Sequence, residues 1–162
     1  MSAEQRLKEL GIELPPTATP VANYVGVKRV GSLLFVAGHG PARDAQGNRP
    51  TGKLGRELTV EQGYAAARSC GLNLLATVRA ELGSLDRVRQ IVKVLGMVNC
   101  APGFDQTPPV INGCSDLFVE VFGQEAGSHA RAAVGMAELP SSIPVEIEMI
   151  VEVGEDTEWT LA

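Results

Sequence analysis

A strong alternation of apolar and charged residues over positions 145–153 constrains the fold more than any other feature. Every odd position is Val, Ile or Met, and three of the four even positions are Glu. A period of two residues is that of a β-strand with one buried face. The apolar face needs a second layer to pack against, and two long segments with helical spacing can supply it. The sequence therefore predicts an α+β fold in which two helices pack on one face of a β-sheet.

The remaining patterns predict the order β-β-(β)-α-β-α-β-β. The first long helix is the most clearly marked, because Thr59 and Gln62 form a capping-box pair and Gly83 suits its C-terminal end. The expected elements are a short helix at 3–10, hairpin strands at 24–30 and 33–37, a polar loop at 43–56 with room for a short strand, helices at 59–82 and 110–122, a buried strand at 91–98, and final strands at 130–137 and 145–153. We expect an N-terminal arm (1–20), a single domain (21–154) and a C-terminal tail (155–162).

Composition disfavours several classes of function. With 162 residues, a net charge of −5 and scattered Lys and Arg, the chain lacks the basic surface of a nucleic-acid-binding protein. No apolar run approaches the ~20 residues of a membrane-spanning helix, and residues 1–6 do not resemble a signal peptide. Three cysteines without C-x-x-C spacing favour neither disulfides nor a metal site. We expect a cytoplasmic protein with no membrane contact, no metal and no cofactor.

The last two strands carry an unusual pair of charges. We expect these strands to form a hairpin that turns at Ser141-Ser142. Its register places Glu146 opposite Ala137, and it places Arg131 opposite Glu152. On this register Arg131 and Glu146 share the helix-free face of the sheet but lie roughly 20 Å apart, at ~3.3 Å per residue. They could act on one small molecule only across an interface between subunits.

Small residues on the same predicted face support such an interface, because they allow another surface to approach closely. Val134 and Met136 predict the core-facing side of this strand, which leaves on the helix-free face the alternating residues Arg131, Ala133, Gly135 and Ala137. Two plainer interpretations remain open. Arg131 could form a cross-strand salt bridge with Glu152 worth only ~0.2–1 kcal/mol, and the glutamates could mark a solvated face. Spacing alone favours these structural interpretations.

Several short segments, spread over most of the chain, match one known family. They are Ala130-Arg131, Val134, Leu139-Pro140 and Glu146-Ile147-Glu148 near the C-terminus, and Tyr24-Val25, Gly31, the apolar strand at 33–36 and Ala37-Gly38-His39 near the N-terminus. In order and spacing they resemble the RidA (YjgF) family of imine and enamine deaminases, especially its longer members, which are often named endoribonucleases. The resemblance implies a chorismate-mutase-like fold and a homotrimer with clefts between subunits.

The resemblance also implies an activity and residues that perform it. The implied reaction is hydrolysis of 2-aminoacrylate-type enamines or imines to 2-oxo acids and ammonia, without metal or cofactor. Arg131 would hold the substrate carboxylate, Glu146 would position a water, and Gly38 would contribute backbone contacts. The other residues implied at the site are Tyr24, His39, Asn112 and Ala133.

Two other functions remain open from the sequence. A non-catalytic protein could use Arg131 to bind a small carboxylate such as a 2-oxo acid, while Glu146 does no chemistry. An endoribonuclease could use His39 and His129 as acid and base, although the acidic chain and its 4% aromatic content disfavour RNA binding.

Overall fold

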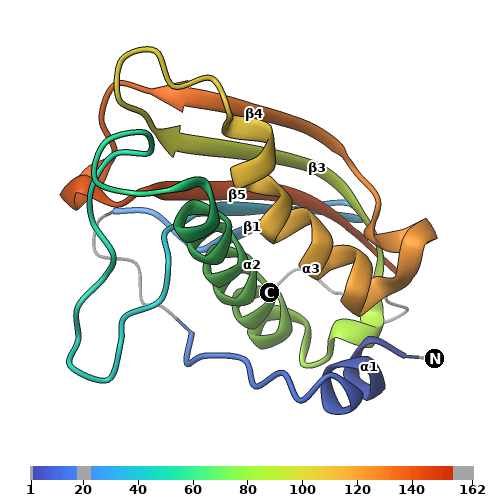
Figure 1. Cartoon of the computed structure of the whole chain (residues 1–162). Coiled ribbons are helices and arrows are strands. Elements are labelled where there is room, and N and C mark those ends of the chain that lie inside the picture. The colour runs from blue at the N-terminus through green and yellow to red at the C-terminus, as the bar shows by residue number, and fades with distance from the viewer. Residues whose placement is uncertain (1, 18–22, 155–162) are drawn as a thin grey trace.

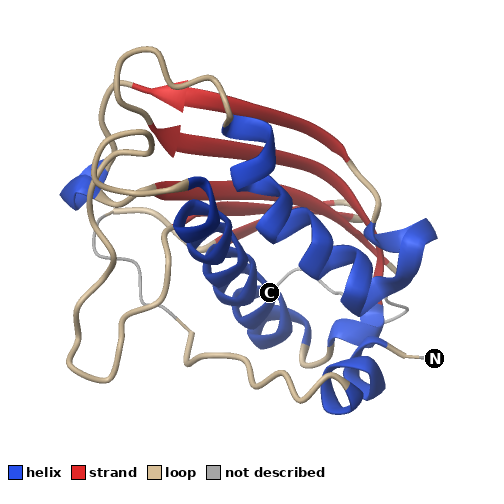
Figure 2. Cartoon of the chain, in the orientation of Figure 1, coloured by secondary structure: helices blue, strands red, loops and turns tan. Residues whose placement is uncertain are grey.

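The computed structural model describes residues 2–17 and 23–154, in which five strands form one sheet covered on one face by two long helices (Figures 1 and 2). The strands are β1 (Val27–Val30), β2 (Leu33–His39), β3 (Val88–Asn99), β4 (Ala130–Met136) and β5 (Val145–Val153). The helices are α1 (Ala3–Glu9), α2 (Val60–Leu82) and α3 (Thr107–Gly127), with 3-10 turns at Leu85–Arg87 and Pro140–Ser142. The α+β class with two helices on one sheet face is confirmed.

Local sequence signals set the ends of both long helices. The Thr59 side chain accepts from the Gln62 backbone and the Gln62 side chain accepts from the Thr59 backbone, which is the predicted capping box. Gly83 follows α2 with a φ of 79°. α3 begins at Thr107, before the predicted start, because prolines suit the first turn of a helix. Gly123, with a φ of 81°, interrupts its last turns.

The first strands follow the predicted order. β1 and β2 form the expected antiparallel hairpin, in which Val30 pairs with Leu33. The polar loop that follows contains no strand, and Leu54 makes only isolated bridges there, with Leu58 and Cys100. Near its end the loop contacts the end of β3, where the Leu54 N–H donates to the Asn99 carbonyl at 2.8 Å.

The predicted short helix near the N-terminus is present as α1. Its Ala3 and Leu7 side chains are buried in the same core as the long helices. The division into arm, domain and tail stays a prediction, and parts of it (18–22 and 155–162) lie outside the described residues. Among the described helices, none combines the length and apolarity that crossing a membrane requires.

The predicted hairpin of the last two strands is wrong. The strand order is β1-β2-β5-β3-β4, so β3 lies between β4 and β5. β4 runs parallel to β3, while β5 is antiparallel to β2 and β3. The connection at 137–144 crosses the end of β3, where the Asn99 N–H donates to the Pro144 carbonyl at 2.8 Å. This connection is long enough to span the ~10 Å between strands two positions apart, so a tight turn is not required.

This topology changes the face on which Arg131 lies. Arg131 is paired with Val94, and Val94 is paired with Met149. Both apolar partners are buried under the helices, and paired residues point to the same side of a sheet. Arg131 therefore points to the helix-covered face. Glu146 alternates along β5 with buried residues, so its side chain points to the helix-free face. The prediction that Arg131 and Glu146 share one face is wrong.

The small residues of β4 lie on the helix-covered face together with Arg131. Ala133 packs against the core, and a Cβ on Gly135 would lie 3.1 Å from the Cys100 sulfur. The prediction that these small residues lie on the helix-free face is therefore wrong. The helix-free face of β4 instead presents Val134 and Met136, which are 40% and 36% exposed.

Close packing of α2 on α3 depends on a glycine. A Cβ at Gly113 would collide with the backbone carbonyl of Tyr64 on α2. A Cβ at Gly63 would meet only side chains, those of Leu54 at 2.6 Å and Val110 at 3.1 Å. Side-chain ends can move aside but a helix backbone cannot, so Gly113 sets how closely the two helices approach.

Replacing Gly113 by Ala should destabilise the protein, even though Ala is the better helix former by roughly 0.5–1 kcal/mol. The added methyl group would force the helices apart, at a cost of about 2 kcal/mol. Gly63→Ala is the matched control, because the groups it meets can adjust. Urea unfolding followed by circular dichroism should show the larger loss for Gly113→Ala, and equal losses for both variants would contradict this account.

Candidate functional site

Two groups of polar residues lie at separate places in the folded structure. The first lines a cleft of about 410 Å³ at the ends of β2 and β5, which we call the β2–β5 cleft. Its lining includes Tyr24, Gly38, His39, Arg43, Arg49 and Glu146. The second group lies where α3 covers β4, and we call it the Arg131 cluster. It consists of Arg131, Asn112, Ser115 and His129.

Glu146 reaches the cleft beside a β-bulge in β2. Between Val36 and His39, β2 has one residue more than the facing part of β5. At this point the Glu146 carboxylate lies directly over Gly38, so that a Cβ at Gly38 would collide with Oε1. Glycine is needed here because Glu146 occupies the space that a side chain would fill.

The surroundings of Glu146 suit a proton acceptor. Burial raises the pKa of its carboxyl above the usual value, and the nearby charge of Glu148 raises it further. Among the described residues no hydrogen bond or ion pair engages the Glu146 carboxylate. A base whose pKa is shifted towards the working pH accepts a proton from water more effectively than an ordinary surface carboxylate.

His39 is held as a neutral side chain between β2 and α2. Its Nδ1 lies 2.7 Å from the Ala37 carbonyl, which can only accept, so Nδ1 carries the proton. Nε2 then accepts from the Thr77 hydroxyl at 2.8 Å. Burial lowers the pKa of His39, the Ala37 bond opposes this, and Arg49 lowers it further. His39 therefore fixes the end of β2 against α2.

In the Arg131 cluster a chain of hydrogen bonds orients the guanidinium. Nη1 of Arg131 donates to Asn112 Oδ1 at 2.9 Å and to Ser115 Oγ at 3.0 Å. His129 Nδ1 donates to the Gly127 carbonyl at 2.7 Å, which leaves Nε2 to accept the Ser115 proton at 2.9 Å. The Ser115 oxygen thus stays an acceptor for Arg131. Since only Nη1 is engaged among the described residues, Nε and Nη2 can make a bidentate contact with a carboxylate.

The predicted site residues fall into these two groups. Tyr24, Gly38, His39 and Glu146 line the β2–β5 cleft, and Asn112 contacts Arg131. Ala133 follows on the same side of β4 as Arg131 but packs against the core, and its carbonyl accepts from Thr107 Oγ1 at 3.0 Å. Their roles in binding or catalysis remain predictions.

The structure does not bring Arg131 and Glu146 together within one chain. Their side chains leave opposite faces of the sheet, and β3 lies between the strands that carry them. Along the strands they are about three residues apart, or roughly 10 Å, because Glu146 is aligned through β3 with Val134. One molecule could contact both only if a second copy of the chain supplied one of them.

Four residues of these groups are absent from the sequence prediction of the site. Ser115 had a usable signal, because it follows Asn112 by three residues and so lies on the same side of the helix. The sequence suggests His129 only as an acid or base for RNA cleavage. Arg43 and Arg49 have no local signal, since both lie in an irregular loop.

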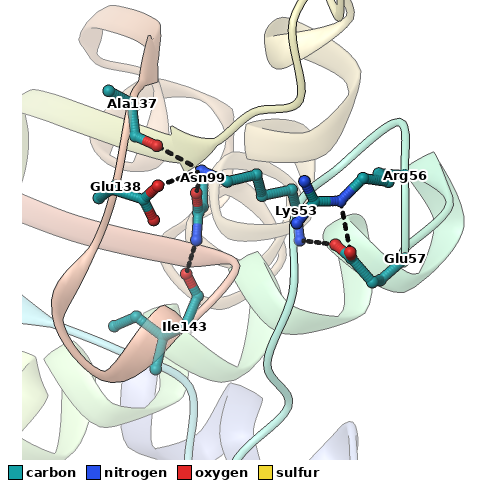
Figure 3. A network of polar contacts seen from close by, with 7 residues as sticks. All are labelled: Lys53, Arg56, Glu57, Asn99, Ala137, Glu138 and Ile143. Atoms are coloured by element: carbon teal, nitrogen blue, oxygen red, sulfur yellow. Dashed lines mark hydrogen bonds and ion pairs between the residues drawn. The ribbon is translucent and has the colours of Figure 1, made fainter.

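The loop before α2, which forms one wall of the cleft, is tied to the end of β3 (Figure 3). The Lys53 ammonium donates to Asn99 Oδ1 at 2.8 Å and to the Ala137 carbonyl, and it pairs with Glu138 at 3.1 Å. The Lys53 side chain is only 13% exposed, so water screens these contacts less than an ordinary surface pair. The cleft wall is therefore anchored to the sheet.

The described residues offer neither a metal site nor an activated thiol. No three of their His, Cys, Asp or Glu side chains are grouped so that they could hold an ion. Burial raises the pKa of the Cys70 and Cys114 thiols, which keeps both protonated and poorly nucleophilic.

Comparison with known proteins gives one consistent family. Residues 4–150 match the family model described as "YjgF/chorismate_mutase-like, putative endoribonuclease". Protein TCP17 of Trypanosoma cruzi is 47% identical over 146 residues, which cover 90% of this chain and 91% of that protein. The crystal structure of a protein of unknown function from Agrobacterium tumefaciens is 44% identical, with a TM-score of 0.82 and coverage of 94% and 92%. A "putative endoribonuclease" from Shewanella oneidensis is 33% identical, with a TM-score of 0.88 and coverage of 94% and 100%.

The free energy of unfolding should fall as the pH is lowered below about 6.5. Burial lowers the pKa values of His39 and His129 from the 6.5 of a free histidine, so the unfolded chain takes up protons first. The stabilisation that depends on the two neutral histidines should be fully present above pH 6.5. It should decline as the pH falls towards their pKa values in the folded protein, and it should level off below those values. Urea unfolding at fixed protein concentration from pH 5.5 to 7.5 measures this slope. His129→Gln should flatten it, and an unchanged slope in that variant would contradict the assignment.

Proposed function

The chain belongs to the YjgF/chorismate-mutase-like family, and on that premise we propose that it hydrolyses 2-imino acids, formed from 2-aminoacrylate-type enamines, to 2-oxo acids and ammonia. We further infer a homotrimer in which the Arg131 cluster of one subunit faces the β2–β5 cleft of the next. One observation carries the proposal: each chain holds a pre-oriented cation and a half-buried base on opposite faces of its sheet.

The Arg131 cluster supplies the grip on the substrate carboxylate. Asn112 and Ser115 fix the Nη1 side of the guanidinium, so the free edge has a defined direction. Two parallel hydrogen bonds from Nε and Nη2 match the geometry of a carboxylate. Each charge-assisted bond contributes roughly 1.5–3 kcal/mol, which is enough to hold a small acid in one orientation.

Glu146 supplies the base that directs water at the imine carbon. The carboxylate removes a proton as the water oxygen bonds to carbon, and the carbinolamine then releases nitrogen as ammonia. In total, an iminium C=NH2⁺ and one water give a carbonyl C=O and NH4⁺. The raised pKa of Glu146 suits this transfer near neutral pH. Positioning and one base are sufficient because the uncatalysed hydrolysis is already fairly fast.

The helix-free face of the sheet supports assembly with other copies. Phe35 and Val134 are 43% and 40% exposed on it. A groove of about 580 Å³ on this face is lined in part by Leu95, Ala132 and Ile150. Large apolar side chains gathered on one open sheet face are typical of surfaces that another subunit covers. Such an interface would also place sites from two chains side by side.

A binding protein without catalysis is the alternative, because the Arg131 cluster alone could hold a 2-oxo acid. RNA cleavage has less support from the geometry. His39 and His129 lie in different groups, and each is neutral with both ring nitrogens hydrogen-bonded. The relatives named as endoribonucleases therefore do not by themselves assign that activity to this chain.

Arg131→Ala and Glu146→Gln should both abolish acceleration of imine hydrolysis, for different reasons. A threonine dehydratase generates the imine, and release of 2-oxobutyrate is followed with and without the protein. Arg131→Ala should weaken 2-oxobutyrate binding by tenfold or more, given ~1.4 kcal/mol per tenfold. Glu146→Gln should leave binding within about twofold while acceleration falls roughly 10²-fold or more. Glu152→Gln, on the same strand face, is the matched control.

Mixing the two inactive variants tests where the site is completed. In randomly assembled trimers about one quarter of the interfaces would combine an intact Arg131 with an intact Glu146, so about a quarter of the activity should return. No recovery after verified subunit exchange would contradict a site shared between subunits. Wild-type protein that binds 2-oxobutyrate but accelerates no imine would instead be the non-catalytic binder.

Glu148→Gln should move the acid limb of the kcat/KM profile to lower pH. Glu148 raises the pKa of Glu146, so removing its charge keeps the base deprotonated at more acid pH. Glu152→Gln, six residues from Glu146 along β5, should leave the limb in place. An unmoved limb in Glu148→Gln would show that Glu146 is not the titrating base.

A further inference from the structure

The Arg49 guanidinium lies at the β2–β5 cleft and has no hydrogen-bond or ion-pair partner among the described residues. Its Nε is buried and makes no hydrogen bond, and no ion pair engages it among the described residues. A buried donor left unsatisfied costs about 1–3 kcal/mol, and more when it carries charge. Nε is the one guanidinium nitrogen that the protein encloses, so a ligand in the cleft would contact Arg49 through its Nη atoms, and a carboxylate there would compensate the unpaired charge.

The loop that carries Arg49 is built to hold it in place. At its start, Ala42 N–H donates to Ser69 Oγ at 2.8 Å and Asn73 Nδ2 donates to the Gly40 carbonyl at 2.9 Å. Beyond Arg49, the loop is anchored to the end of β3 by the Lys53 contacts of Figure 3. Arg49 is thus presented by a segment fixed on both sides.

Contacts place the Arg49 guanidinium beside Gly40 rather than beside the Glu146 carboxylate. A Cβ at Gly40 would lie 3.8 Å from Arg49 Nη1. Arg49 is also among the charges that lower the pKa of His39, whereas it is not among those that act on Glu146. The cation and the base therefore occupy different parts of one cleft.

The charge of the cleft favours a second acidic group on the ligand. Arg43 and Arg49 line it against the single carboxylate of Glu146, and His39 is neutral. This local excess of positive charge occurs in a chain whose net charge is −5. A volume of about 410 Å³ lies within the range of roughly 300–1,000 Å³ that small-molecule sites occupy.

We propose that Arg49 binds a carboxylate at the far end of the substrate, so that the site selects 2-imino acids with an acidic side chain. The inference rests on the proposed function, in which Arg131 holds the α-carboxylate and Glu146 serves the imine carbon. The side-chain carboxylate takes no part in the bond changes. It fixes the substrate at its second end. Arg43, at the rim of the cleft, adds positive charge that favours binding of this carboxylate.

Binding of 2-oxoglutarate and of 2-oxopentanoate, measured by calorimetry, tests the subsite directly. These acids share a five-carbon chain and differ in the terminal carboxylate. The wild-type protein should prefer 2-oxoglutarate at least tenfold. Arg49→Gln should remove the preference while changing 2-oxopentanoate affinity less than twofold, and Arg49→Lys should keep part of it. Equal affinities in the wild type, or equal losses for both acids in Arg49→Gln, would overturn the proposal.

Arg56 provides the matched control on the same loop. It pairs with Glu57 and its side chain is 60% exposed, outside the cleft lining. Arg56→Gln should leave both affinities unchanged. Arg49→Gln removes an unsatisfied buried donor, so its melting temperature should equal or exceed that of the wild type. A lower melting temperature together with loss of both ligands would identify Arg49 as structural and overturn the proposal.

Turnover separates failure of this inference from failure of the proposed function. An amino-acid oxidase can generate the imines of glutamate and of norvaline, whose hydrolysis is then followed as ammonia release. Preferential acceleration of the glutamate imine that is lost in Arg49→Gln would support both proposals. Equal acceleration of both imines, unaffected by Arg49→Gln, would overturn the acidic subsite and leave deamination intact. Arg49-dependent binding of 2-oxoglutarate without acceleration would overturn deamination and retain the subsite.

Discussion

The buried side chain and backbone of Asn99 form the contact on which the cleft end of the molecule depends. Asn99 is 1% exposed, and its four polar groups all have partners in other segments. Its side chain accepts from Lys53 and donates to the Ile143 carbonyl, while its backbone bonds Pro144 and Leu54. One residue thus joins the end of β3 to the loop before α2 and to the connection between β4 and β5 (Figure 3). Because a buried amide is costly to leave unsatisfied, these contacts fix the cleft walls more specifically than apolar packing would.

The sequence carries more information about which helices and strands form than about which strands lie side by side in the sheet. Capping by Thr59 and the two-residue period of the last strand depend on residues close together in the chain, and both features are present in the structure. Strand order depends instead on the path of the connections. The strand around Arg131 has few large apolar residues, and the sequence assigns two of them, Val134 and Met136, to its buried side. Once β3 takes the place between β4 and β5, that assignment reverses.

The same difference separates the site residues that sequence could predict from those that it could not. Glu146 stands out because it alternates with buried residues, and Gly38 because it follows a strand at the spacing of a known family. Ser115 has a signal in its spacing from Asn112, but His129 acts on Arg131 only through Ser115, across the contact of α3 with β4. Arg49 reaches the cleft only through the fixed course of its loop. A linear pattern contains no record of these tertiary contacts.

A site divided between two faces of one sheet also divides its chemical tasks. In the proposed site the Arg131 cluster would contact the part that all 2-imino acids share, since every such substrate has an α-carboxylate. The β2–β5 cleft holds the base together with the loop of Arg43 and Arg49, which would contact the part that differs between substrates. In the proposed trimer these tasks fall to different subunits. Changes in the loop could then alter which side chain is accepted without disturbing the orientation of Arg131, because no hydrogen bond of that cluster involves the loop. This separation offers a physical reason why one fold with a fixed carboxylate grip can serve substrates of different charge.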